Sequence, residues 1–255
     1  MKLIKNTKNK YNVSTIEAAL KDYAEGKIII VTDDEDRENE GDMIFSAEKS
    51  TPDHVNFLAK YGRGLVCVPM EEERLDALNL KMMTNNNTSL HETPFTMSVD
   101  YRIGTTTGIS TSDRDKTIKA LIDENTIPED LARPGHIFPL KATKGGVLRR
   151  VGHTEAVVDM SKLAGHYPAG VLCEVMKDNG EMARMNDLFE IAEKHNLKII
   201  TIRDLIKYRL KREVLVERMV DSHLPSRFGD FQIILYKSRV DNIEHIALVK
   251  GEIDS

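Results

Sequence analysis

Apolar and polar positions follow two alternating patterns through the first 200 residues. Short apolar runs bounded by turn residues indicate buried strands, and apolar positions every three or four residues indicate amphipathic helices. Strands are expected at 28–32, 43–46, 65–68, 95–101, 171–176 and 198–202, and helices at 16–25, 52–61, 71–78, 112–124, 153–163 and 186–195. This interleaving predicts one large α/β (α+β) domain, with a mixed sheet layered with helices.

Polar residues at the element ends predict where helices and turns begin. Ser14 with Glu17 is typical of a capping box, and Ser112 is followed by Asp115 at the same spacing. Gly41-Asp42 is a turn signal that would fold the preceding loop back on itself.

The pattern changes after residue 202. A charged helix is expected at 203–213, followed by strands at 214–220, 230–236 and 243–249. About 40 residues are too few for an independent core. We therefore expect a 1–202 domain, followed at 203–255 by a connector helix and an incomplete, β-rich segment.

Composition narrows the class of protein. The 255 residues are 40% hydrophobic and 30% charged, with a net charge of −5 and no basic stripe, which argues against nucleic acid or an anionic membrane as partner. The N-terminus lacks an apolar signal core, and no run approaches the ~18 apolar residues that span a bilayer. Cys67 and Cys173 lie in apolar runs and are expected to be reduced thiols of a cytoplasmic protein.

One acidic run is the strongest chemical signal. Residues 33–42 hold seven carboxylates and a single cation, Arg37, between two apolar segments. Massed negative charge costs folding free energy unless a cation sits among it, so the run indicates a divalent metal site. A solvated acidic loop is the alternative.

The same run matches an EF-hand calcium loop only in part. With Asp36 as position 1, Glu38, Glu40 and Gly41 fit the EF-hand pattern, but position 12 is Ala47 instead of glutamate. An EF-hand also needs a helix before the loop, and the preceding residues are strand-like. A calcium-binding module is therefore kept only as an alternative hypothesis.

Two hydroxyl-containing stretches could bind an anion. Arg150, Gly152, His153 and Thr154 stand where a helix begins, and free N–H groups there favour a phosphate. A simple helix cap is the alternative. The run 105–112 offers the same choice between an anion cradle and a serine/threonine turn.

Two further residues are candidates for acid–base work. His136 lies in a proline-bracketed turn, where histidine is commonly structural. Glu174 interrupts an apolar strand, so it either faces solvent or is buried with a raised pKa, as in a working acid or base. Together these groups suit metal-assisted enolisation of a phosphorylated hydroxyketone.

From about residue 13 to 202 the chain resembles the 3,4-dihydroxy-2-butanone 4-phosphate synthases. The stretches that carry the resemblance are 33–45, 105–113, 135–140, 152–156 and 168–174. The resemblance implies a lyase of riboflavin biosynthesis that converts D-ribulose 5-phosphate to L-3,4-dihydroxy-2-butanone 4-phosphate and formate. It also implies Mg²⁺ or Mn²⁺, with two ions per site, and a homodimer with its active site at the interface. A catalytically silent scaffold is the second rival.

The resemblance also implies roles for particular residues. Glu38 and His153 correspond to metal ligands, and His136 and Glu174 to catalytic residues. The residues that correspond to substrate contacts are Arg37, Glu38, Asp42, Arg150, Gly152, His153, Thr154 and Glu174. Leu90 and Met185-Asn186 depart from the family pattern without touching these positions.

The tail resembles a second family. Residues 220–231 and 245–251 are similar to the opening strands of GTP cyclohydrolase II. That enzyme needs a cysteine-ligated zinc, and no cysteine follows Cys173. We therefore do not expect this chain to hydrolyse GTP.

Overall fold

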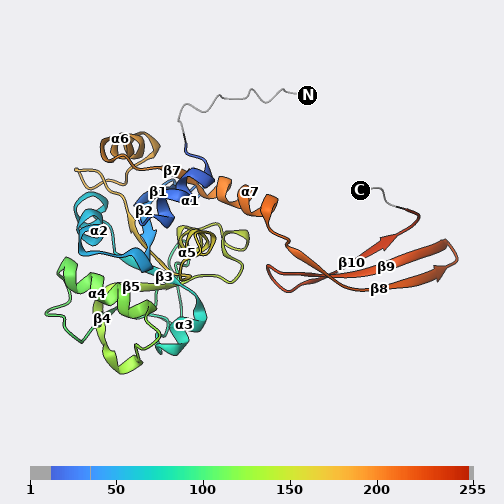
Figure 1. Cartoon of the computed structure of the whole chain (residues 1–255), viewed down its shortest axis with the longest axis horizontal. Coiled ribbons are helices and arrows are strands. Elements are labelled where there is room, and N and C mark those ends of the chain that lie inside the picture. The colour runs from blue at the N-terminus through green and yellow to red at the C-terminus, as the bar shows by residue number, and fades with distance from the viewer. Residues whose placement is uncertain (1–12, 35, 253–255) are drawn as a thin grey trace.

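The computed structural model of the protein describes residues 13–34 and 36–252, so the N-terminal stretch and Glu35 discussed above lie outside it. Figure 1 shows a larger body of helices around a sheet, and a narrow three-stranded sheet that extends from its last helix. The helices are α1 (Ile16–Ala24), α2 (Pro52–Phe57), α3 (Glu72–Ala77), α4 (Thr111–Ile122), α5 (His153–Leu163), α6 (Met185–His195) and α7 (Ile202–Arg212). Short helical turns are η1 (Ala47–Lys49), η2 (Leu58–Gly62), η3 (Pro128–Asp130) and η4 (Gly146–Leu148).

The larger sheet is mixed, as the sequence predicts. Its strands are β1 (Ile29–Thr32), β2 (Gly41–Ser46), β3 (Cys67–Met70), β4 (Val99–Tyr101), β5 (Leu131–Lys141), β6 (Gly170–Glu174) and β7 (Ile199–Thr201). They lie in the order β4-β5-β3-β6-β2-β1-β7. The pairs β1–β7 and β3–β5 are parallel, and the other neighbours are antiparallel.

Helices cover both faces of this sheet, which confirms the layered fold. Side chains alternate along each strand, so Ile30 of β1 packs into one apolar core while Ile29 and Val31 pack into the other. The first core lies under α2, α3, α4 and α6, and the second under α1, α5 and α7. Leu205 of α7 is fully buried in the second core, so α7 packs on the body; the domain boundary at 202/203 stays a prediction.

The acidic run turns earlier than the sequence predicts. Gly41 and Asp42 are not a turn but the first residues of β2, because Gly41 pairs with Thr32 of β1. The chain instead turns at 36–38, and Asn39 takes the left-handed conformation with φ of 55°. Because of this register, Asp42 is a strand residue, paired with Val31 of β1 and Glu174 of β6.

The expected turn around His136 is part of β5. The pairing of β4 with β5 jumps from Val99–Ile137 to Asp100–Ala132, so residues 133–136 bulge out of the ladder. The N–H groups of Gly135 and His136 donate to the side-chain oxygens of Ser98 and Asp100 instead of to backbone carbonyls of a neighbouring strand. Strand β5 was missed because its prolines and glycine look like a turn.

Two predicted helix caps are displaced. The hydroxyl of Thr15, not that of Ser14, accepts the N–H that caps α1. Likewise Ser110, not Ser112, caps α4 by accepting the N–H of Asp113 at 3.1 Å. Each true cap has extended backbone and lies directly before its helix, as a capping residue must.

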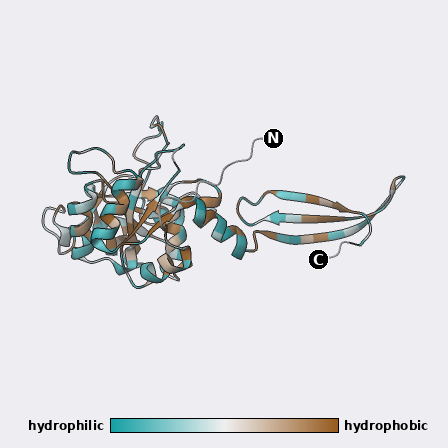
Figure 2. Ribbon diagram, turned by 90° about the horizontal axis from the view of Figure 1, so that it is seen from above, coloured by the Kyte–Doolittle hydropathy of each residue, from teal (hydrophilic) through white to brown (hydrophobic). Residues whose placement is uncertain are grey.

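The C-terminal sheet has one largely apolar face. Strands β8 (Val216–Ser226), β9 (Gly229–Ser238) and β10 (Glu244–Val249) pair antiparallel in the order β10-β9-β8. Figure 2 shows hydrophobic and hydrophilic stretches along these strands, beyond α7. Their register places seven apolar side chains on one face: Val220, Leu224, Phe231, Ile233, Leu235, Ile246 and Leu248. In the part of the chain described, no helix is long and apolar enough to cross a membrane.

Candidate functional site

Asp33 organises the acidic run. Its buried carboxylate accepts the backbone N–H groups of Glu38 at 3.0 Å and Glu40 at 2.9 Å. It also accepts a hydrogen bond from Arg37 Nη1 at 3.0 Å. These donors offset the charge of Asp33 and fix the turn between β1 and β2. The loop therefore holds a single shape that aims Glu38 at the start of α5.

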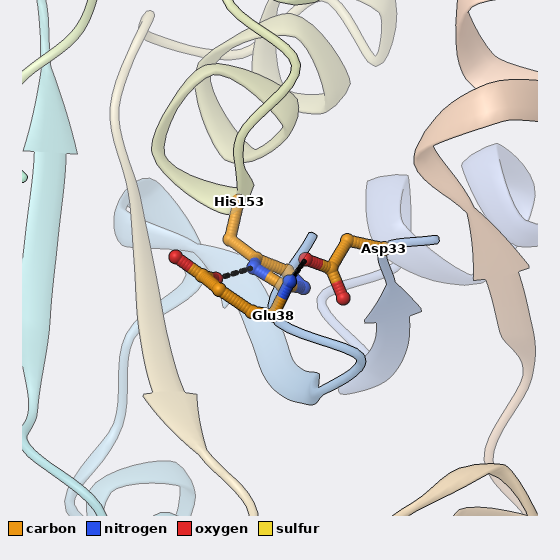
Figure 3. Close-up of side chains that lie close together, drawn as sticks. All are labelled: Asp33, Glu38 and His153. Atoms are coloured by element: carbon orange, nitrogen blue, oxygen red, sulfur yellow. Dashed lines mark hydrogen bonds and ion pairs between the residues drawn. The ribbon is translucent and has the colours of Figure 1, made fainter. Parts of the chain in front are cut away.

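Glu38 meets His153, the first residue of α5. The Nδ1 atom of His153 is 3.4 Å from Glu38 Oε2, and Figure 3 shows the two side chains converging beside Asp33. Burial alone would lower the pKa of His153. The negative charge of Asp42 and the hydrogen bond with Glu38 have the larger combined effect and raise this pKa to about 9. Burial alone would raise the pKa of Glu38, yet His153 and Arg37 lower it to about 2.

Three of these side chains suit a divalent cation. Asp33, Glu38 and His153 each offer a ligand atom, and the three atoms lie within 4.8 Å of one another. The Nε2 atom of His153 is buried and has no hydrogen-bond partner among the described residues. Two carboxylates and one imidazole match the ligands of Mg²⁺ or Mn²⁺ sites rich in oxygen. The residues present therefore fit the metal that the sequence predicts, with Asp33 as an added candidate ligand.

Asp42 and Glu174 form a second carboxylate pair. They are direct cross-strand partners on β2 and β6, and Asp42 Oδ2 is 3.9 Å from His153 Nδ1. Burial raises the pKa of Asp42 to about 7, with His153 opposing the rise and Glu174 adding to it. Such a group can hold or release a proton near neutral pH.

Glu174 is fixed by the backbone opposite it. It is half-buried, and its Oε2 accepts the N–H of Leu65 at 2.8 Å. A Cβ on Gly64 would lie 2.3 Å from the same oxygen, so only glycine lets the carboxylate approach. Glu174 therefore lies between the two alternatives left by the sequence, since it is neither fully buried nor on a fully exposed face.

The start of α5 carries a positioned arginine. Arg150 donates from Nη1 to the buried Glu155 at 2.7 Å and from Nη2 to the His91 carbonyl at 3.0 Å. Gly152 is the N-cap residue and has no side chain to cap the helix, and a Cβ there would lie 2.4 Å from Arg150 Nη1. Free N–H groups, Thr154 and a fixed guanidinium thus occupy one helix end, a suitable place for a phosphate.

Most predicted site residues line one cleft. Its walls bring together residues from the acidic run, β2, β3, β5, β6, the start of α5 and the segment before β4. The lining residues are Arg37, Glu38, Glu40, Asp42, Cys67, Thr93, Phe95, Leu140, Arg150, His153, Thr154, Leu172 and Glu174.

His136 does not line this cleft. Its Nδ1 is 2.6 Å from Asp100 Oδ2, and its side chain is 42% exposed. The neighbouring run 105–112 uses its hydroxyls internally: Thr106 bonds Asp113, and Ser110 caps α4. The serine/threonine turn, rather than an anion cradle, describes that run.

Sequence reasoning missed several cleft residues. Cys67, Thr93 and Phe95 carry no motif, because only the neighbouring strands and loops bring them to the cleft. Asp33 could have been separated from the rest of the acidic run by one signal. It directly follows β1, where a carboxylate can accept the N–H groups of the following loop.

Comparisons with known proteins show the family of the chain. The sequence model described as 3,4-dihydroxy-2-butanone 4-phosphate synthase matches residues 17–208, and the one described as GTP cyclohydrolase II matches residues 217–254. The riboflavin biosynthesis protein RibBA of Aquifex aeolicus is 54% identical over 247 residues, which are 96% of this chain and 61% of that protein. The chain thus spans about three-fifths of the length of such relatives.

Solved structures share the fold as well. RibBX of A. baumannii, described as a two-domain 3,4-dihydroxy-2-butanone 4-phosphate synthase, superposes with a TM-score of 0.86 at 44% identity, over 94% of this chain and 70% of that chain. A synthase solved in complex with two magnesium ions gives a TM-score of 0.74 at 36% identity, over 78% of this chain and 98% of that one. By sequence and fold, the chain belongs to the 3,4-dihydroxy-2-butanone 4-phosphate synthase family of riboflavin biosynthesis.

Proposed function

We propose that the protein converts D-ribulose 5-phosphate to L-3,4-dihydroxy-2-butanone 4-phosphate and formate. The observation that carries this proposal is the convergence, in one cleft, of a cation-binding cluster, an acid–base carboxylate pair and a positioned arginine. Enolisation of a phosphorylated ketose needs all three: a charge stabiliser, a proton acceptor and an anchor for the phosphate.

Glu38 and His153, with Asp33 beside them, would hold Mg²⁺ or Mn²⁺, and we propose two ions per site. When bound, a divalent cation lowers the free energy of negative charge that develops on the oxygens of the sugar. A synthase solved with two magnesium ions supports this choice. The buried Nε2 of His153, which has no hydrogen-bond partner among the described residues, supports it independently, because a buried polar atom without a partner is costly.

The chain's own groups would bind the substrate and move its protons. Arg150, Thr154 and the Gly152 end of α5 would bind the phosphate, and Arg37 would add positive charge across the cleft. Asp42, with its pKa near 7, would exchange a proton with the sugar. Glu174, held by the Leu65 N–H, would serve as the second acid–base group.

We also propose a homodimer that completes the site. The resemblance assigns His136 a catalytic role, yet its own chain leaves it half-exposed and outside the cleft. A second copy that brought His136 to this cleft would reconcile the two observations. Sedimentation and complementation between a His136→Ala and a Glu38→Gln subunit would test it, since mixed dimers should regain part of the activity.

The decisive experiment is an assay of formate released from ribulose 5-phosphate with Mg²⁺. Activity should vanish with EDTA and fall about a hundredfold or more in Glu38→Gln and His153→Ala. Asp34→Asn is the matched control, because Asp34 belongs to the same run, is half-exposed and does not line the cleft. Full activity in both ligand variants would refute the metal site, and a folded wild type without formate would favour the scaffold reading. Calcium binding without formate would favour the calcium module.

A further inference from the structure

The C-terminal sheet contacts a loop that leads into the cleft. Residues 143–150 connect β5 to the start of α5, and the turn between β9 and β10 lies against them. Arg149 Nη1 is 3.0 Å from Asp241 Oδ2. A Cβ on Gly145, which has φ of +95°, would lie 2.8 Å from the Val240 carbonyl oxygen. Two neighbouring turn residues therefore touch both ends of the loop.

Helix α7 holds the same loop from the other side. Arg209 Nη1 donates to the Gly145 carbonyl at 3.0 Å and to Asp159 Oδ2 at 2.7 Å. That oxygen of Asp159 also accepts the N–H of Val147 at 2.8 Å, and Asp159 is 4% exposed. The loop thus lies between a buried ion pair on the body and a single ion pair to the C-terminal sheet.

This loop carries the arginine that faces the cleft. The N–H groups of Arg149 and Arg150 both donate to the Gly146 carbonyl, at 2.9 and 3.1 Å. Adjacent residues that share one acceptor move together, so a displaced Arg149 displaces Arg150. The Arg150 guanidinium must keep its place between Glu155 and the His91 carbonyl to face the cleft.

Asp241 is itself fixed before it meets Arg149. Its Oδ1 accepts the N–H of Ile243 at 3.1 Å within the turn, which leaves Oδ2 for Arg149. The Asp241 side chain is 19% exposed, so little rotamer entropy remains to be lost when the ion pair forms. The carboxylate is therefore a rigid contact rather than a loose surface charge.

We propose that Asp241 is a positioning residue for Arg150, acting through its ion pair with Arg149. The C-terminal segment would thereby help to set the phosphate-binding arginine of the body, an inference that rests on the proposed function. A phosphate keeps its bonds throughout the reaction, so a contact to it contributes equally to ground and transition states. Loss of the contact should therefore raise KM and leave kcat unchanged.

Asp241→Asn tests this in the full chain. Asparagine keeps an oxygen for the Ile243 N–H and removes the charge that faces Arg149. KM for ribulose 5-phosphate should rise about two- to fivefold with kcat within twofold, the size expected for one ion pair of this exposure. Arg149→Gln should give a similar rise, and the double variant should give no further rise, because both changes remove one interaction.

Asp221→Asn is the matched control. Asp221 pairs with Arg218 within β8, on the same sheet, and its carboxylate is half-exposed. Its KM should equal that of the wild type. A rise in this control as large as in Asp241→Asn, or additive effects in the double variant, would refute the positioning role.

Hydrogen exchange separates this proposal from the proposed function. The amides of residues 145–150 should exchange faster in Asp241→Asn than in wild type, and those of α5 should not. If the wild type releases no formate, the proposed function fails and exchange alone decides whether the contact holds the loop. Unchanged exchange, or faster exchange with an unchanged KM, would overturn the proposal.

Discussion

Asp42 and Glu174 lie directly opposite each other on two antiparallel strands in the middle of the sheet. Like charges at such positions destabilise a sheet, and Asp42 is also 4% exposed. Proteins keep arrangements of this kind where function needs them, at a cost in stability. Replacing a carboxylate of this pair should therefore lower activity and raise stability.

Asp42→Asn should stabilise the metal-free protein and inactivate it. A carboxyl whose pKa rises from 3.8 to about 7 on folding opposes folding increasingly as pH rises through that interval. The variant should therefore gain about 1–2 kcal/mol in free energy of unfolding at pH 8 and little at pH 4. Urea unfolding in EDTA at both pH values measures this. An equal or larger gain at pH 4 would contradict the assignment.

Gly64→Ala should displace Glu174, although Gly64 itself does not line the cleft. The new Cβ would lie 2.3 Å from Glu174 Oε2, so Glu174 must move away from the Leu65 N–H. We expect formate release to fall about tenfold or more and stability to fall by about 1–3 kcal/mol. Gly165→Ala is the control, since Gly165 has a positive φ but no neighbour within 4 Å. It should lose stability and keep its activity.

Metal should stabilise the wild type through His153. A ligand that binds only the folded state raises its stability by about 2.7 kcal/mol at a hundred times its Kd. Millimolar Mg²⁺ or Mn²⁺ should therefore raise the Tm of EDTA-treated protein by several degrees, and His153→Ala should lose most of this shift. Differential scanning fluorimetry at fixed ionic strength gives the answer. An equal shift in both proteins would place the binding elsewhere.

Asp22 should contribute to acid sensitivity. Its hydrogen bonds with Lys198 and Lys27 lower its pKa below the ordinary value of 3.8. Because the folded pKa is the lower one, this contribution is present above the ordinary value and disappears as pH falls through the folded value. Asp22→Asn should lose about 0.5–1 kcal/mol at pH 7 and less at pH 2. Thermal unfolding at the two pH values checks the sign.

The layered fold was predictable because burial leaves a direct mark on the sequence. A run such as 28–32 is apolar on both sides only if both faces of its strand are covered. Strand β5 left no such mark. The bulge at 133–136 satisfies its N–H groups through side chains, so it tolerates proline and glycine that sequence patterns assign to turns.

The site was predictable only in part for a different reason. Residue types indicated a cation site within 33–42 and an anion site where α5 begins, and only the resemblance named Glu38 and His153 as metal ligands. Their approach depends on Asp33 folding the loop and on the register of β1 with β2, neither of which appears in local sequence. The contact of Asp241 with Arg149 joins segments that no periodicity relates.

The parallel pairing of β1 with β7 has a consequence for biosynthesis of the chain. Thr32 bonds the Ile200 carbonyl across 168 residues of sequence, so the strand that precedes the acidic run stays without its outer neighbour until most of the body has been translated. Contacts between such distant segments form slowly. Until then the nascent chain exposes Ile29–Thr32 as an unpaired strand edge. The charged run 33–42 follows this strand directly, and its charge disfavours pairing of the edge with other chains.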